Sequence, residues 1–227
     1  MSKKGSRKMG KCAYCGKRKE LSQDHVIPLC LFPKVRQKDE EMIIVYACDN
    51  CNNVKKSKHD SFLRDLLVGD LWNENNPLAQ EPYQAMLRAV SKNRSPLARY
   101  MFENAHPETY ISKDGQFRAN AYVTHFDENL RAQFNNTFET IARGFYFKNW
   151  GKIYPIEYTF DILRFEPAAY LEAICDLKQY GVSSCRRLSD GVFTWTGAYV
   201  KDDPAHSIQL LSFYDRVMFG IISNPPN

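Results

Sequence analysis

The chain has 227 residues, of which 44% are hydrophobic and 13% aromatic, a composition typical of a folded protein rather than a disordered one. No apolar run reaches the roughly 18 residues of a membrane span, and the start, MSKKGSRKMGK, lacks the apolar segment of a signal peptide. We therefore expect a soluble, cytoplasmic protein that has no membrane partner.

The net charge of +5 is unevenly distributed. The first 70 residues hold 15 Lys and Arg against 9 Asp and Glu, whereas the rest of the chain is almost neutral. Such a basic segment fits either a solvated face or a polyanionic partner.

Four of the seven cysteines form two C-x-x-C pairs, and the other three, Cys30, Cys175 and Cys185, stand alone. A reducing cytoplasm argues against disulfides. Four thiolates are the ligand set of a structural Zn²⁺ site, and a two-residue spacing lets both sulfurs of a pair face one ion. We predict that Cys12, Cys15, Cys48 and Cys51 bind zinc and that the lone cysteines are small buried apolar residues.

The chain divides into four parts by composition. Residues 1–10 read as a flexible basic lead-in, 11–70 as a compact, motif-dense domain, 71–77 as a polar linker, and 78–227 as a larger second domain. We expect an α+β fold class, with a small zinc-bound N-terminal domain followed by a larger α+β C-terminal domain.

Within residues 11–70, Ile43–Tyr46 is β-branched and aromatic, which predicts a short strand. A helix is expected to start near Cys51 or Asn52, because the later apolar residues Phe62, Leu63, Leu66 and Leu67 follow the spacing of an amphipathic face.

The second part alternates between helical and extended patterns. In chain order we expect two helices within 78–104 interrupted at Ser95-Pro96, a hairpin from Tyr110 to His125 turning at 113–115, a helix capped by Asp127, a strand over 154–165, a helix over 167–180, and two or three strands within 192–223 with a turn at 201–204.

An Asp-His step, Asp24-His25, lies between the two cysteine pairs. Adjacent side chains on a strand point to opposite faces, so one can bind a metal while the other faces a nucleophile. Asp24 offers the hard oxygen ligand that Mg²⁺ prefers, and His25 has the pKa range of a general base. Taken alone, such a dipeptide is more often an ordinary surface pair.

The stretches KCAYCG, QDHVIPLCLF and ACDNCNNVKKSKHD together resemble the HNH nucleases with a ββα-metal core, over roughly residues 11–66. The resemblance implies a metal-dependent endonuclease that hydrolyses DNA. It implies that Asp24 and Asn52 bind one catalytic Mg²⁺ or Mn²⁺, that His25 activates water, and that the four paired cysteines hold a structural zinc.

The lysines after the second cysteine pair are candidates for nucleic-acid binding. Lys55, Lys56 and Lys58 would lie on a helix beside the scissile phosphate, and His59 is a further candidate contact. For the lysines alone a solvated helix face explains the pattern equally well, and a lone helix histidine is more often neither ligand nor contact.

The sequence departs from the family pattern in two respects. Ile43 stands where the family usually carries an asparagine that ties down the Asp-His loop, so rigidity must come from elsewhere or activity is reduced. Asn52 and Asn53 both fit the spacing to a following lysine, and we prefer Asn52 because it directly follows the cysteine.

The second part offers no comparable motif. His106, His125 and His206 are expected to be structural or exposed, and the aromatic residues around Phe145 to pack in the core. Its expected role is substrate selection, dimerisation or binding of a partner protein.

The function we expect is an endonuclease of double-stranded DNA, with RNA still open as a substrate, that acts in restriction, phage defence or a mobile element. One rival is a zinc-stabilised nucleic-acid-binding protein whose nuclease centre has decayed, as Ile43 suggests. A third interpretation is a zinc-ribbon scaffold for protein partners.

Overall fold

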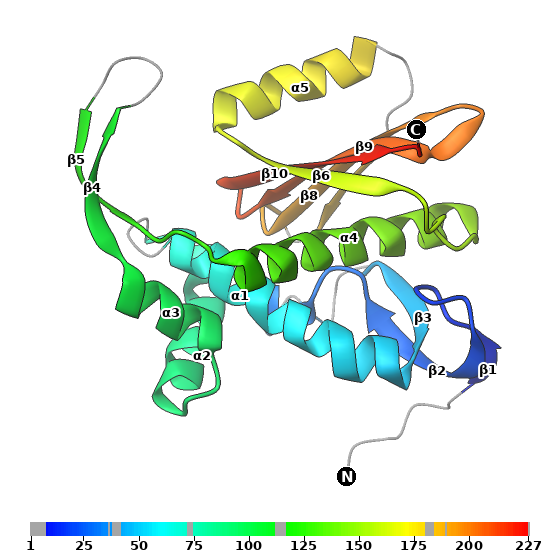
Figure 1. The fold of residues 1–227 in the computed structure, drawn as a ribbon, viewed down its shortest axis with the longest axis horizontal. Helices are drawn as coiled ribbons and strands as arrows, with labels where there is room; N and C mark the ends of the chain where they lie inside the picture. Colours follow the sequence, from blue (N-terminus) through cyan, green and yellow to red (C-terminus); the bar gives the residue numbers. More distant parts are fainter. Residues whose placement is uncertain are drawn as a thin grey trace.

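The computed structural model describes residues 8–35, 37, 42–71, 75–111, 117–179, 184–188 and 190–226, with backbone only for 109–111, 117–122, 179 and 184. Over these residues, antiparallel sheets and helices alternate in a mixed architecture (Figure 1), so the expected α+β class is confirmed. No helix in the described ranges is long and apolar enough to cross a membrane.

The N-terminal sheet has the order β1-β2-β3 and consists of β1 (Lys8–Lys11), β2 (Arg18–His25) and β3 (Ile44–Cys48). The expected strand at Ile43–Tyr46 is confirmed, with its bounds shifted toward Cys48. After β3 the chain forms a π-helical segment, Asn50–Lys56, which continues into helix α1 (Ser57–Asp70). The expected helix therefore exists, but its first turns are wider than an α-helix and change which side chains face inward.

Two short helices and a hairpin follow. Helices α2 (Gln80–Ser91) and α3 (Pro96–Asn104) are separated where the sequence predicts, because Ser95 caps α3 by accepting a bond from the Ala98 amide at 3.3 Å. Strands β4 (His106–Ile111) and β5 (Phe117–Val123) form the expected hairpin. Its predicted turn at 113–115 lies outside the described residues.

Helix α4 (Glu128–Trp150) is the longest helix described. Asp127 caps it as expected, because its Oδ1 accepts from the Leu130 amide at 2.8 Å, and Gly151 ends it with a φ of 63°. The aromatic residues near the end of α4 differ in their exposure to solvent. Phe145 and Tyr146 are buried as predicted, whereas Trp150 is 44% exposed.

The larger sheet has the order β6-β10-β9-β8-β7 and is antiparallel throughout. Its elements are β6 (Thr159–Phe165), α5 (Pro167–Gln179), β7 (Ser184–Leu188), β8 (Phe193–Val200), β9 (Asp203–Phe213) and β10 (Val217–Asn224).

Three details of this half differ from the sequence predictions. The first strand begins at Thr159 instead of 154, because Tyr154 is a buried loop ring whose hydroxyl donates to the Ala205 carbonyl. Strand β7 was not expected. Cys175 and Cys185 are exposed, so the prediction that they are buried was wrong: Cys175 is on the open face of α5, and Cys185 is on an edge strand.

Helix α4 lies between the larger sheet and the N-terminal elements (Figure 1) and packs against both. On one side Phe145 stacks on Trp195 of β8, with ring centroids 4.6 Å apart. On the other, a Cβ added at Gly144 would lie 2.9 Å from the Val26 methyl groups, so glycine allows the exit of β2 to approach the helix closely. One hydrophobic core thus contains residues from both sides of the linker predicted at 71–77.

Candidate zinc centre and active site

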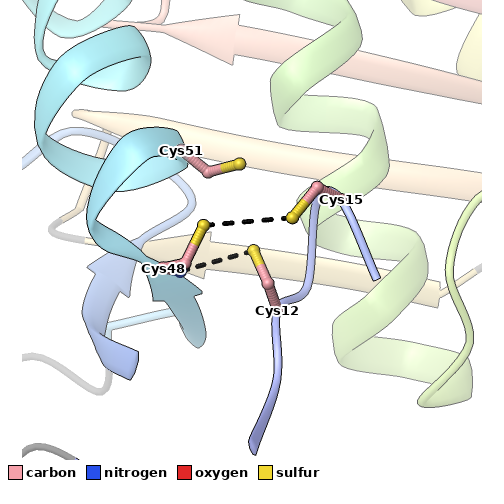
Figure 2. Close-up of side chains that lie close together, drawn as sticks. All are labelled: Cys12, Cys15, Cys48 and Cys51. Atoms are coloured by element: carbon pink, nitrogen blue, oxygen red, sulfur yellow. Dashed lines mark hydrogen bonds between the residues drawn. The ribbon is translucent and has the colours of Figure 1, made fainter. Parts of the chain in front are cut away.

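The four paired cysteines meet at the edge of the N-terminal sheet (Figure 2). Cys12 and Cys15 lie in the turn between β1 and β2, Cys48 ends β3, and Cys51 lies in the π-helical segment. Their four sulfur atoms lie within 4.8 Å of one another, and the Sγ atoms of Cys15 and Cys48 are 3.9 Å apart. Sulfurs bound tetrahedrally at about 2.3 Å from zinc are about 3.8 Å apart, so the cluster fits a Zn²⁺ ion.

Hydrogen bonding within the cluster favours a thiolate. The Cys48 amide donates to the sulfur of Cys12 at 3.3 Å. Burial raises the pKa of the Cys48 thiol, but hydrogen bonds from the Cys51 amide and from neighbouring thiols outweigh it and lower the pKa to about 7. Burial raises the pKa of Cys51, and nearby sulfurs raise it further. Negative charge on four converging sulfurs needs a cation, which zinc would supply.

Asp24 and His25 are the last two residues of strand β2 and pair with Val45 and Ile44 of β3. The ladder continues one residue further, because the Val26 amide donates to the Ile43 carbonyl at 2.8 Å. The side chain of Asp24 is almost completely buried, and its Oδ2 accepts the Tyr14 hydroxyl at 2.5 Å. Burial raises the pKa of Asp24, although Lys56 and the Tyr14 bond oppose that shift.

His25 is half-buried at the exit of the strand. Burial lowers the pKa of its imidazole below the usual value, and the positive charge of Lys56 lowers it further. The ring is therefore neutral at pH 7 and able to accept a proton.

Asn52 fastens the π-helical segment to strand β2. Its Nδ2 donates to the Ser22 hydroxyl and to the Gln23 carbonyl, both at 3.0 Å. With both amide hydrogens used, Oδ1 is the atom left to bind a metal. Asn53 instead donates to Asp49 at 2.7 Å on the exposed side of the segment.

The family pattern has an asparagine at the position of Ile43, where it ties down the Asp-His loop. The side chain of Ile43 is buried in the hydrophobic core. A link to the Asp-His step is nevertheless present, since Asn52 binds the carbonyl immediately before Asp24.

Lys56 is placed differently from our prediction of a phosphate contact. It is 2% exposed, and its Nζ lies 2.7 Å from Asp60 Oδ1 and 3.5 Å from Asp24 Oδ1. The π-helical turns bring this lysine inward, where it neutralises two carboxylates. Lys55 and Lys58 remain exposed, as a contact with phosphate requires.

His59, the other candidate contact, faces helix α4. Its Nδ1 lies 3.2 Å from the Thr140 hydroxyl, and its side chain is half-buried. Burial lowers its pKa, and Lys56 and Lys55 lower it further. The contact with α4 gives His59 a structural role in this arrangement.

A pocket of about 340 Å³ opens over these residues. Its lining includes Asp24, His25, Asn52, Ser57, Asp60 and Arg64. The guanidinium of Arg64 is held by the buried carboxylate of Asp65, with Nε to Oδ1 at 2.7 Å, and Ser95 donates to that same carboxylate. The pocket thus combines a carboxylate, an imidazole, an amide and a fixed cation.

Sequence reasoning did not find four residues of this site: Tyr14, Ser22, Asp60 and Arg64. Asp60 carries a weak signal, since it is four residues after Lys56 on a helix. Tyr14 lies inside the first cysteine pair, but nothing in the sequence shows that its hydroxyl reaches Asp24. Burial also raises the pKa of Asp60, and Lys56 opposes the shift.

Residues 12–67 match a family model described as HNH endonuclease. No curated protein and no solved structure matches the chain. The matched segment covers well under half of the sequence and contains the cysteine cluster and every residue of the Asp24 pocket discussed above. Together with the cysteine cluster, the match shows that the N-terminal part of this chain is an HNH endonuclease domain.

Proposed function

We propose that this protein is a metal-dependent DNA endonuclease, with His25 as general base and one Mg²⁺ or Mn²⁺ held by Asp24 and Asn52. The observation that carries the proposal is that these three side chains line one open pocket inside the matched HNH segment. The bond from Asn52 to Gln23 supports it further, since it links the amide to the strand that carries the other two groups.

The donor set suits a hard divalent cation. Asp24 contributes a carboxylate oxygen and Asn52 an amide oxygen, and Mg²⁺ characteristically takes few protein ligands and keeps water on the rest. When bound, the ion would stabilise charge on the phosphate and on the departing 3′ oxygen. The Tyr14 hydroxyl orients the Asp24 carboxylate by donating to Oδ2 of Asp24. The other carboxylate oxygen, Oδ1, lies on the side that Lys56 approaches.

His25 removes the proton from the attacking water. Its lowered pKa keeps the imidazole neutral at pH 7, which is the form that accepts a proton. Because the histidine activates the nucleophile, one metal ion suffices where other nucleases use two.

In this proposal three cations bind the substrate backbone. Lys55 and Lys58 are exposed on the helical segment beside the pocket, and Arg64 lies in its wall. The rigid fork of a guanidinium suits a phosphate group. These contacts would position the strand without reading its sequence.

We favour DNA over RNA, and a role in restriction, phage defence or a mobile element inside the cytoplasm. One HNH domain holds one active centre, so a double-strand break needs two copies or two successive nicks. The rival function is a nucleic-acid-binding protein with an inactive centre. Ile43 favours this rival, because its buried apolar side chain replaces the family's asparagine.

A plasmid cleavage assay separates the two functions. With Mg²⁺ or Mn²⁺, the parent protein should nick supercoiled DNA, and His25→Ala should lose at least about a hundredfold in rate while keeping its zinc and its DNA affinity. His206→Ala, outside the HNH domain, is the matched control and should cleave like the parent. Equal cleavage by the parent and His25→Ala would refute the role of His25, and a parent that binds DNA without cutting it would favour the rival.

A further inference from the structure

Three metal-binding side chains meet at the open end of the β4–β5 hairpin, outside the HNH domain. His106 and Glu108 lie two residues apart on β4, so they share a face, and His125 follows the end of β5. The Nε2 atoms of both histidines approach the same carboxylate oxygen, Glu108 Oε1, at 2.8 Å for His106 and 3.1 Å for His125. All three ligand atoms lie within 4.8 Å of one another.

The orientation of His106 is that of a metal ligand. Its Nδ1 lies 3.1 Å from the carbonyl oxygen of Asn104, which can only accept a hydrogen bond, so Nδ1 carries the proton. In the neutral ring Nε2 then presents its lone pair to Glu108. Histidines that bind metals usually donate their other ring N–H to a carbonyl or carboxylate in this way. A lone pair facing a carboxylate oxygen needs either a proton or a metal cation between the two, and the same geometry suits both.

We propose that His106, Glu108 and His125 form a second metal site, which binds a divalent transition-metal ion such as Zn²⁺. Two imidazoles and one carboxylate suit zinc and its neighbours in the transition series better than Mg²⁺ or Ca²⁺. Ligand atoms held tetrahedrally at about 2.0–2.1 Å from zinc are about 3.3 Å apart. The observed separations of 2.8 and 3.1 Å need only a small outward movement to reach that value.

The site is open to solvent, which leaves room for water as a further ligand. The side chains of His106, Glu108 and His125 are 48%, 42% and 70% exposed. Such a site exchanges its metal faster than the cysteine cluster, in which three of the four residues are buried. The two sites are therefore distinguishable in one protein.

A metal here would join the end of α3 to the start of α4. The Tyr100 hydroxyl of α3 donates to the His125 carbonyl at 3.0 Å. The next residue, Phe126, packs edge-on against Phe62 of α1, with ring centroids 6.3 Å apart. The ion would thus fix the hairpin base beside the contact that holds the helix of the HNH domain.

Metal content of the full-length protein tests the proposal. After equilibration with Zn²⁺ and gel filtration in buffer that contains a low concentration of free zinc and an excess of Mg²⁺, which keeps zinc from the proposed Asp24–Asn52 site, mass spectrometry of the metal should find two zinc ions per chain, one for each cluster. The double variant His106→Ala/His125→Ala should hold one, and the control His206→Ala should hold two. A parent that holds a single ion, or a double variant that still holds two, would overturn the proposal.

Cobalt provides an independent check that the second ion is at the histidine site. The first Co²⁺ equivalent should give the intense thiolate charge-transfer absorption of a cysteine site, and the second should add only the weaker visible bands of nitrogen and oxygen ligation. Glu108→Gln, which preserves the side-chain size, should weaken binding of the second equivalent by about tenfold or more and leave the first unchanged. Thiolate absorption that grows with both equivalents, or full second-site affinity in Glu108→Gln, would contradict the assignment.

Discussion

Asn52 joins the helical half of the HNH domain to strand β2, because its Nδ2 donates to the Gln23 carbonyl at 3.0 Å, one residue before Asp24. The same residue is the expected metal ligand through Oδ1. Asn52→Ala removes both functions, whereas Asn52→Asp keeps an oxygen ligand and loses the donor.

We expect Asn52→Ala to lose about a hundredfold or more in cleavage rate, and Asn52→Asp to retain more of it. In both variants, amide exchange at the end of β2 should accelerate, as hydrogen exchange followed by mass spectrometry would record. Asn53→Ala is the matched control, since the one bond described for the Asn53 side chain goes to Asp49 on the exposed side. Unchanged amide exchange at β2 in Asn52→Ala would show that the hydrogen bond from Asn52 to the Gln23 carbonyl does not stabilise the strand.

Lys56 gives the site an internal cation between Asp24 and Asp60. Without added metal, Lys56→Met should lower the free energy of unfolding by about 3 kcal/mol, because it leaves a buried carboxylate unpaired. Mn²⁺ should restore part of that loss, so the rise in melting temperature on adding Mn²⁺ should be larger in the variant than in the parent. Lys58→Met, at an exposed lysine, should change neither the free energy of unfolding nor the rise in melting temperature on adding Mn²⁺. If Mn²⁺ raises the melting temperature equally in Lys56→Met and in the parent, the lysine and the metal do not compete.

Arg64 is proposed to bind phosphate from the pocket wall, where Asp65 fixes its guanidinium. Arg64→Lys keeps the charge but loses the planar fork, so we expect a KM for DNA raised several-fold with a smaller change in kcat. Steady-state cleavage kinetics would measure both. Arg99→Lys, on the surface of α3, serves as control, and a normal KM in Arg64→Lys would exclude the contact.

The cysteine cluster should be required for folding of the N-terminal sheet. Cys48→Ser should lose the tightly held zinc and abolish the cooperative thermal transition of this region, since structural zinc binding supplies folding free energy directly. Cys175→Ser, at an exposed cysteine of α5, should keep both metal content and melting temperature. A Cys48→Ser protein that melts like the parent would show that the sheet folds without the metal.

His59 should make the free energy of unfolding depend on pH. Its pKa is lowered in the folded state, by burial first and then by Lys56 and Lys55, so the unfolded chain binds protons more readily below about pH 6.5. Its contribution is therefore complete above the unfolded pKa and is lost as pH falls toward the folded pKa. Urea denaturation at about pH 7.5 and 5.5 should show a smaller loss in His59→Gln than in the parent, and an equal loss in both would refute this contribution.

The sequence was sufficient where the chemistry depends on short spacings. Two C-x-x-C pairs predicted the sulfur cluster, and the cap at Asp127 and the break at Ser95 followed from local side-chain bonding. The positions of Asp24 and His25 at the end of a strand also followed from their neighbours.

Features that depend on long-range packing were not predicted. Lys56 was expected on a helix beside the scissile phosphate, whereas the π-helical turns bring it inward against Asp60. His59 meets Thr140, 81 residues later in the chain. The hydrophobic core shared by the HNH domain and α4 depends on Gly144, whose missing side chain gives no periodic signal.

The most direct test of the catalytic centre is a crystal structure of the protein soaked with Mn²⁺ and measured at a wavelength where manganese scatters anomalously. We expect one anomalous peak in the pocket, about 2.2 Å from an oxygen of Asp24 and from Oδ1 of Asn52, with Lys56 moved away from Asp24 and His25 facing a water molecule. A pocket without that peak, in which Lys56 still bridges Asp24 and Asp60 at a saturating concentration of Mn²⁺, would contradict the metal-dependent mechanism.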